Sequence, residues 1–211
     1  MHPFILLDID GTLVDSNGLH AESWQAALAQ YGVESDLATL RRLIGKGSDK
    51  LLPEATGISA ESDLGARITE TRGKLFMRDF LPRVQPFPSS RVFVERILAL
   101  GLKPVVASSA NARELEALLE VAQVKDLLPL KTGADDADSS KPDPDIVQAA
   151  LKRASAKPKD AVLVGDTPYD LEAATRAGVE FIGVRSGGWG DADLKGAIAI
   201  YDDVSELAAR L

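Results

Sequence analysis

The sequence predicts an α/β fold in which a parallel sheet lies between two layers of helices, with a helical segment inserted near the N-terminus. Short apolar runs recur along the chain, and such runs are typical of strands that are buried on both faces. Helical patterns of about ten residues alternate with these runs, as they do in βαβ units. The insertion is predicted because residues 16–83 contain helical patterns and no convincing strand.

Five apolar runs are the predicted strands. The first covers residues 4–7 and stops at acidic residues and a glycine. The others cover residues 104–107, 127–130, 161–164 and 180–184. Because helical patterns lie between most of them, the connections are long enough to join parallel strands.

The helices of this main part are predicted at residues 91–99, 112–121, 144–154 and 168–177. Gly101 and Gly178 stand where these helices are expected to end, because glycine adopts the left-handed conformation of a helix terminus at no steric cost. Asp143 and Pro144 form an ordinary helix start, with Asp143 as the N-cap and Pro144 as the first helical residue.

The inserted segment has its own pattern. Its helices are predicted at residues 20–31, 37–44 and 62–80. The glycine-rich residues 45–48 interrupt them as a flexible loop, and Pro82 marks the return to the main fold. We therefore predict a Rossmann-like core of residues 1–15 and 84–211 and a helical cap domain of residues 16–83.

Composition excludes several classes of protein. Cysteine is absent, which leaves no disulfide, thiolate metal site or thiol nucleophile, and only two histidines are present. The net charge is −8, from 24 basic and 32 acidic residues, which disfavours nucleic acid as a partner. No apolar run approaches the ~20 residues of a membrane helix. A strand that begins near Phe4 leaves no room for a signal peptide, so a soluble, cytoplasmic protein without a membrane partner is expected.

Reactive side chains follow the predicted strands, at the edge of a parallel sheet where ligands bind. Asp8 and Asp10 follow the first strand and point the same way, because side chains two apart on a strand share a face. One carboxylate can attack a phosphorus atom while the other moves a proton. The structural alternative is that Asp10 and Gly11 form only a turn.

Two further strand ends carry groups that suit a phosphate. Ser108 and Ser109 follow the second long strand, where hydroxyls and free backbone N–H groups can bind phosphate oxygens. The alternative is helix capping by Ser109 or Asn111. Lys141 precedes a helix start and can bring a positive charge between a nucleophilic carboxylate and a phosphate.

Asp166 and Asp170 complete the set. Asp166 follows a strand, where a carboxylate can reach a hard cation such as Mg²⁺. Asp170 is expected to act through a water or as a cap, because Thr167 and Asp170 also match a capping box with Pro168 at the first helical position.

Together these residues resemble the four motifs of the haloacid dehalogenase superfamily, in particular its phosphoglycolate phosphatase and β-phosphoglucomutase branch with a helical cap. The residues that carry the resemblance are Asp8-x-Asp10-Gly11-Thr12, Ser108, Lys141-Pro142 and Gly165-Asp166-x-x-x-Asp170. The resemblance covers nearly the whole chain. It implies an enzyme that acts on a small phosphorylated metabolite.

The resemblance also implies a role for each matching residue. Asp8 would be the nucleophile and Asp10 the general acid and base, while Ser108 and Lys141 would bind the phosphoryl group. Mg²⁺ would be held by Asp8, the Asp10 carbonyl and Asp166, with Asp170 in support. We therefore expect Mg²⁺-dependent hydrolysis of a phosphate monoester through an aspartyl-phosphate on Asp8.

Three residues are weaker candidates for contact with the substrate or cap. His20 can orient Asp10 or sense cap closure, although it can equally be a polar residue at a helix start. Thr12 belongs to the first motif, and Lys46 lies in the loop that would close over the site. Arg185 and the glycine-rich residues 187–190 could border the site, although a surface loop is the favoured interpretation.

Two other functions stay open at this stage. A phosphosugar mutase would resemble this chain at His20 and Trp24, but Ile44 and Ser48 replace the cap-loop lysine and arginine that bind a second phosphate. Lys46 or Lys50 could substitute for them, although the expected pattern is missing, so hydrolysis is favoured. A non-catalytic phosphate-binding or receiver-like module uses similar residues, yet such modules usually have ~120 residues and no cap.

Overall fold

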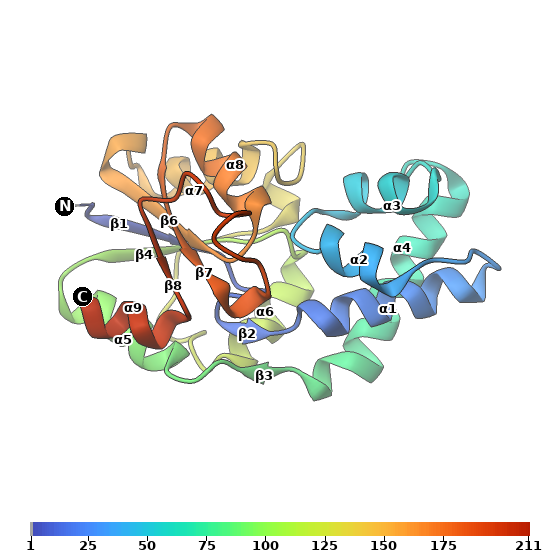
Figure 1. The fold of residues 1–211 in the computed structure, drawn as a ribbon, viewed down its shortest axis with the longest axis horizontal. Helices are drawn as coiled ribbons and strands as arrows, with labels where there is room; N and C mark the ends of the chain where they lie inside the picture. Colours follow the sequence, from blue (N-terminus) through green and yellow to red (C-terminus); the bar gives the residue numbers. More distant parts are fainter. Residues whose placement is uncertain (1) are drawn as a thin grey trace.

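A computed structural model, which describes residues 2–211, contains one large parallel sheet. Its strands are β1 (Phe4–Leu7), β4 (Lys103–Ala107), β5 (Lys131–Thr132), β6 (Ala161–Gly165), β7 (Glu180–Val184) and β8 (Ala199–Tyr201). Their order across the sheet is β5-β4-β1-β6-β7-β8, and every neighbouring pair is parallel (Figure 1). The predicted α/β fold class is confirmed, and β1 occupies a central position.

Helices cover both faces of this sheet, which makes three layers. They are α5 (Ser90–Ala99), α6 (Ala112–Val121) and α9 (Val204–Arg210) on one face, and α7 (Asp145–Ala154) and α8 (Pro168–Ala177) on the other. Side chains of β1 alternate between the two layers: Ile5 and Leu7 pack with the first group, and Leu6 packs with the second. No helix within residues 2–211 has both the length and the apolar character needed to cross a bilayer.

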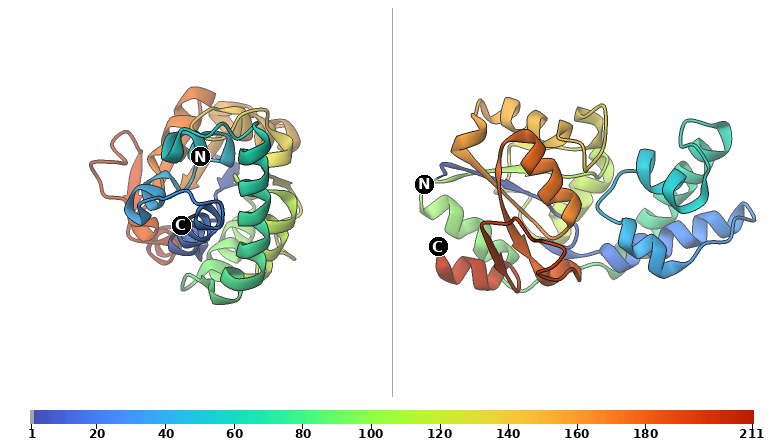
Figure 2. Two further views of the ribbon diagram at one scale, coloured as in Figure 1. Left: turned by 90° about the vertical axis from the view of Figure 1, so that its right-hand side faces the viewer. Right: turned by 45° about the horizontal axis from the view of Figure 1, so that its top comes forward.

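The chain between the first strand and α5 forms a separate helical body. It comprises α1 (Asn17–Gln30), α2 (Leu37–Leu43), α3 (Ser48–Thr56) and α4 (Asp63–Leu75), followed by a π-helical turn (Phe76–Phe80) and a short 3₁₀ turn (Leu81–Arg83). These helices share their own apolar core, in which Trp24, Leu40 and Leu52 are buried. Figure 2 shows this body at the end of the molecule opposite to both termini.

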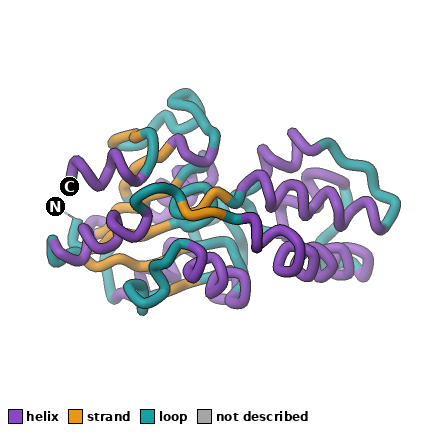
Figure 3. Tube along the Cα trace, turned by 90° about the horizontal axis from the view of Figure 1, so that it is seen from below, coloured by secondary structure: helices purple, strands orange, loops and turns teal. Residues whose placement is uncertain are grey.

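Two chain segments join the helical body to the sheet, and they pair with each other. β2 (Val14–Asp15) and β3 (Gln85–Pro86) form an antiparallel pair, with Val14 opposite Pro86. Figure 3 shows them between the helical body and the sheet. The predicted boundaries after residues 15 and 83 lie beside this pair; the division into two domains stays a prediction.

Local sequence explains the helix ends nearest the sheet edge. Thr167 and Asp170 form the predicted capping box of α8, with Pro168 at its first position and Gly178 in the left-handed conformation at its end. Asn111, rather than Ser109, caps α6 and accepts a hydrogen bond from the Glu114 backbone N–H. The start of α7 differs by one residue from the prediction, because Pro144 is its N-cap.

One predicted strand is wrong, and one predicted loop is a residue shorter than expected. Residues 127–130 do not form a strand: they lie in a turn and an extended loop, and β5 begins only at Lys131. Pro129 lacks an N–H for a sheet ladder, and the Leu127 N–H bonds back to Val124 in a turn. The loop predicted at residues 45–48 ends at Gly47, because α3 begins at Ser48.

Candidate active site

The candidate residues lie at one edge of the sheet, where the parallel strands end. Asp8, Ser108 and Asp166 each follow directly after a strand, namely β1, β4 and β6. Because Leu7 is in register with Val106 and Val164, the three strands end at the same level. A cavity of about 410 Å³ lies at this edge and is lined by residues of both the sheet body and the helical body.

Lys141 is the buried cation of the site. Its side chain is 1% exposed, and its Nζ lies 2.6 Å from Asp8 Oδ1 and 2.6 Å from Asp170 Oδ1. It also donates a hydrogen bond of 3.0 Å to the Ala107 carbonyl. Burial opposes the charged form, but Asp170 and Asp8 outweigh it and hold the pKa of Lys141 above its ordinary value. Lys141 therefore stays charged beside the proposed nucleophile.

Three buried carboxylates lie close together at the site of Lys141. Asp8, Asp166 and Asp170 each offer an oxygen within 4.8 Å of the others. Burial, with the neighbouring carboxylate charges of Asp170 and Asp10, raises the pKa of Asp8 to about 8 against the opposing effect of Lys141. Burial and the charges of Asp170 and Asp8 likewise raise the pKa of Asp166. A divalent cation would balance this excess of negative charge, and carboxylate oxygens are suitable ligands for one.

The loop after β7 and the start of α1 hold Asp166 in place. Its Oδ2 accepts a hydrogen bond of 2.9 Å from Asn17, and its Oδ1 accepts one of 3.3 Å from Thr12. A Cβ at Gly187 would lie 1.6 Å from Asp166 Oδ2, so only glycine fits there. Residues 187–190 are thus more than a surface loop, because Gly187 packs against the acidic cluster. Thr12 reaches Asp166 and does not line the cavity.

Asp10 occupies a different environment from Asp8. Its Oδ1 accepts a 2.5 Å hydrogen bond from Ser16, and His20 Nε2 lies 2.7 Å from the same oxygen. Burial raises the pKa of Asp10, but His20, Ser16 and the charge of Arg72 overcome that effect and lower the pKa below its ordinary value. The Asp10 carboxylate is not one of the three clustered carboxylates.

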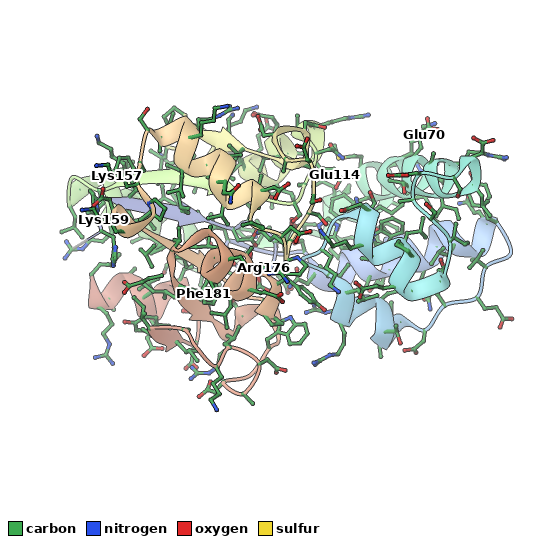
Figure 4. All side chains as sticks on the ribbon, turned by 90° about the horizontal axis from the view of Figure 1, so that it is seen from above. Glu70, Glu114, Lys157, Lys159, Arg176 and Phe181 are labelled. Carbon is green, nitrogen blue, oxygen red and sulfur yellow. The ribbon has the colours of Figure 1, made fainter. Side chains whose placement is uncertain are left out.

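Arg72 links His20 to the sheet body. His20 stacks on Phe76 with ring centroids 4.0 Å apart, and its Nδ1 contacts the Arg72 guanidinium. Arg72, on α4, donates two hydrogen bonds of 2.8 Å to the two carboxylate oxygens of Glu114 on α6. Figure 4 labels Glu114 where the sheet body meets the helical body. A buried ion pair therefore joins the two parts beside Asp10.

The remaining predicted residues line the cavity with different partners. Ser108 Oγ accepts a 3.1 Å hydrogen bond from the Ala110 N–H, and Ser109 Oγ donates one of 3.0 Å to the Gly45 carbonyl. Ser109 thus bonds to the loop between α2 and α3. Lys46 Nζ lies 2.5 Å from Glu54 and 4.6 Å from the centre of the Tyr169 ring.

Three residues of the site were not predicted: Asn17, Arg72 and Glu114. Asn17 follows the first motif closely and could have been noticed as a polar residue near a strand end. Arg72 and Glu114 lie in helical patterns, where charged residues are usually exposed to water. Their pairing joins residues 42 positions apart, so no local signal predicts it.

Comparison with known proteins identifies the family of this chain. The profile of the family described as haloacid dehalogenase-like hydrolase matches residues 5–184. The phosphoglycolate phosphatase of Rhodospirillum rubrum is 27% identical over 213 residues, which cover 96% of this chain and 88% of that protein.

Solved structures resemble the whole chain. A hydrolase from Pseudomonas syringae superposes with a TM-score of 0.90 at 25% identity, covering 98% of this chain and 96% of that one. A putative β-phosphoglucomutase from Bacteroides vulgatus gives a TM-score of 0.87 at 23% identity, covering 98% and 86%, and shows a common fold. With the match over residues 5–184 and the acidic strand ends, these findings confirm the predicted family and its enzyme class: the chain belongs to the haloacid dehalogenase-like hydrolases.

Proposed function

We propose that this protein is a Mg²⁺-dependent phosphatase that hydrolyses a small phosphate monoester through an aspartyl-phosphate on Asp8. One observation carries the proposal: Asp8 ends a central strand, in contact with the buried Lys141 and within reach of two further carboxylates. The similarity to a phosphoglycolate phosphatase over nearly the full chain supports the reaction class. It does not by itself identify the ester.

In the first step, a carboxylate oxygen of Asp8 attacks the phosphorus and the bond to the leaving oxygen breaks. The leaving oxygen takes a proton from Asp10. Because Asp10 is ionised in the free protein, this proton comes from the ester, which binds as its monoanion and protonates Asp10; His20 Nε2, which lies 2.7 Å from Asp10 Oδ1, orients that carboxyl group for the transfer. Lys141 stabilises the negative charge that develops on the phosphoryl oxygens, together with backbone N–H groups after β4.

In the second step, water attacks the aspartyl-phosphate. Asp10 removes a proton from that water, and its lowered pKa keeps it ionised for this role. The products are inorganic phosphate and the restored Asp8 carboxylate. Asp8, the Asp10 carbonyl and Asp166 would hold Mg²⁺, with Asp170 in support, and the ion would neutralise the phosphoryl oxygens and the clustered carboxylates.

The phosphosugar mutase has weaker support. A mutase must bind a second phosphate group over the cavity. The two cap-loop positions where its lysine and arginine are expected hold Ile44 and Ser48. Ile44 is buried and apolar, and Ser48 opens α3. Both residues line the cavity without bringing a positive charge to it.

The test is phosphate release from a panel of phosphate monoesters, with Mg²⁺ or with EDTA. We expect release that requires Mg²⁺ and is lost in Asp8→Asn, because an amide is a poor nucleophile. Asp126→Asn is the matched control, since Asp126 is an exposed aspartate whose ion pair with Arg91 lies outside the cavity lining. Release that survives in purified Asp8→Asn contradicts the mechanism. Isomerisation of a hexose phosphate after addition of a bisphosphate, with little free phosphate, would establish the mutase.

A further inference from the structure

We propose that this cavity selects phosphate esters of neutral, hydroxyl-bearing alcohols, that it discriminates against esters whose leaving group carries a second negative charge, and that Glu114 sets this preference. The inference rests on the proposed phosphatase function. It concerns the part of the cavity where Arg72 on α4 of the helical body contacts Glu114 on α6 of the sheet body.

The cavity offers no unpaired cation to a second anion. Among the described residues that line it, Arg72 and Lys46 are the lysine and arginine side chains. Glu114 accepts two 2.8 Å hydrogen bonds from Arg72, and Glu54 lies 2.5 Å from Lys46. Both cations are also shielded from water, with side chains 12% and 10% exposed. A carboxylate or phosphate on the leaving group would therefore meet two cations whose charges Glu114 and Glu54 already compensate.

The remaining charge of the lining is negative. Its carboxylates are Asp8, Asp10, Asp49, Glu114, Asp135 and Asp138. Asp8 and Asp10 belong to the proposed chemistry. Of the other four, Glu114 is buried, and Asp49, Asp135 and Asp138 are exposed residues of the lining. Like charges brought together in a site of reduced dielectric repel strongly. A neutral leaving group avoids this repulsion.

Two buried polar atoms of α4 indicate that the alcohol bears hydroxyl groups. Thr69 Oγ1 and Arg72 Nε are buried and have no hydrogen-bond partner among the described residues, and both residues line the cavity. Leaving such atoms unpaired is costly, and a substrate hydroxyl that bonds to them recovers the cost. A site built in this way rejects an analogue that lacks the hydroxyl.

Glu114 is the residue that makes Arg72 unavailable. Its side chain is 4% exposed, and both of its carboxylate oxygens bond to Arg72. Replacement by glutamine keeps the size and one acceptor oxygen but removes the charge. Arg72 would then face the cavity as an uncompensated cation, which would favour an anionic leaving group.

The experiment uses two matched pairs of substrates in the presence of Mg²⁺. Glycerol 3-phosphate and 3-phosphoglycerate differ only in a terminal CH₂OH or carboxylate, and 2-hydroxyethyl phosphate and phosphoglycolate differ in the same way. We expect wild type to show a higher kcat/KM for the neutral member of each pair. In Glu114→Gln we expect the ratio of neutral to anionic kcat/KM to fall by about tenfold or more, mainly through KM of the anionic ester.

Glu116→Gln is the matched control, because Glu116 lies on the same helix and pairs with Lys131 and Lys125 outside the cavity lining. Its substrate ratio should equal that of wild type. Thr69→Val provides a second test that leaves the Arg72–Glu114 pair in place: it should lower kcat/KM for 2-hydroxyethyl phosphate and leave that for phosphoglycolate, which has no hydroxyl group, nearly unchanged.

The outcomes separate the two proposals. A wild-type preference for the carboxylate-bearing esters, with release that depends on Asp8, overturns the charge preference and leaves the phosphatase intact. A ratio unchanged in both Glu114→Gln and Thr69→Val overturns the assignment of the specificity to these residues. Absence of Asp8-dependent release from every ester overturns the phosphatase and this inference together.

Discussion

Asp8 and Asp10 show how two neighbouring carboxylates acquire different chemistry. They stand two positions apart, yet burial and nearby carboxylates raise the pKa of Asp8 while His20 and Ser16 help to lower that of Asp10. The divergence matches a division of labour between a nucleophile that needs a cation and a base that is ionised without one. The difference arises from what the fold places beside each residue.

His20 is predicted to tune Asp10. Replacing His20 with asparagine removes the largest influence that lowers the pKa of Asp10, while burial continues to raise it. The pKa of Asp10 should therefore rise, and the acidic limb of the kcat profile, which includes the water-attack step in which Asp10 is the base, should move to higher pH. The profile is measured from phosphate release across the pH range. His2→Asn, at the other histidine, serves as control, and a limb that does not move would contradict the assignment.

Lys141 is predicted to stabilise the fold as well as the site. Lys141→Met leaves Asp8 and Asp170 buried without their cation, and breaking a buried pair in this way typically costs about 3–5 kcal/mol. We expect urea denaturation near neutral pH to show a loss of that order. Lys125→Met, which removes two solvent-exposed ion pairs, should cost much less, because exposed pairs contribute little to stability. Equal losses in the two variants would disprove the prediction.

The sequence predicted the residues that follow strands better than those that lie on helices. Asp8, Ser108 and Asp166 each follow an apolar run, and parallel strands bring such positions together. Arg72 and Glu114 escaped prediction because a buried ion pair between two helices looks, in one dimension, like two exposed charges. Such a pair becomes visible only when the helical body is placed against the sheet.

Among the secondary-structure elements, those with strong end signals were predicted best. α8 has a capping box, an initial proline and a terminal glycine, and its bounds agree with the prediction. By contrast, β8 and α9 near the C-terminus were not predicted, and β5 was misplaced by the apolar residues before it. Leu128 is buried in the core without belonging to a strand. Its apolar side chain therefore indicated burial correctly but did not indicate the backbone conformation.

Gly187, in the segment after β7, is predicted to be required for the position of Asp166. In Gly187→Ala the new Cβ would meet Asp166 Oδ2 at 1.6 Å, so either the loop or the carboxylate must move. We expect weaker Mg²⁺ binding, so that activity requires a higher Mg²⁺ concentration, and at least about a tenfold loss of kcat/KM. Gly190→Ala is the control in the same loop, because its nearest neighbour would lie 3.8 Å away. Comparable activity in the two variants would show that Asp166 tolerates displacement.

For the protein as a unit, the acidic cluster links metal binding to pH. Asp8, with a folded pKa of about 8 against an ordinary value of 3.8, and Asp166, with its raised pKa, hold protons that the unfolded chain has already released. Without metal, stability should therefore fall as the pH rises between these values. Mg²⁺ requires the ionised carboxylates, so its binding should strengthen over the same range.

The measurement is the shift of Tm on addition of Mg²⁺ at pH 6 and at pH 8. We expect a larger shift at pH 8, and a much smaller shift at both values in Asp166→Asn. Asp202→Asn, at an exposed aspartate paired with Arg185, should behave as wild type. A shift that is larger at pH 6 would contradict the proposed state of the cluster.

The paired strands β2 and β3 have a consequence for how this architecture can vary. Val14 and Pro86 stand opposite each other, so the helical body leaves the sheet and returns to it at a single point. For a loop whose ends already meet, added length costs only a logarithmic term in closure entropy. Helices can thus be lengthened, exchanged or recruited between these two anchor points while the carboxylates at the strand ends keep their register. Substrate choice and phosphoryl chemistry can then diverge separately within one polypeptide.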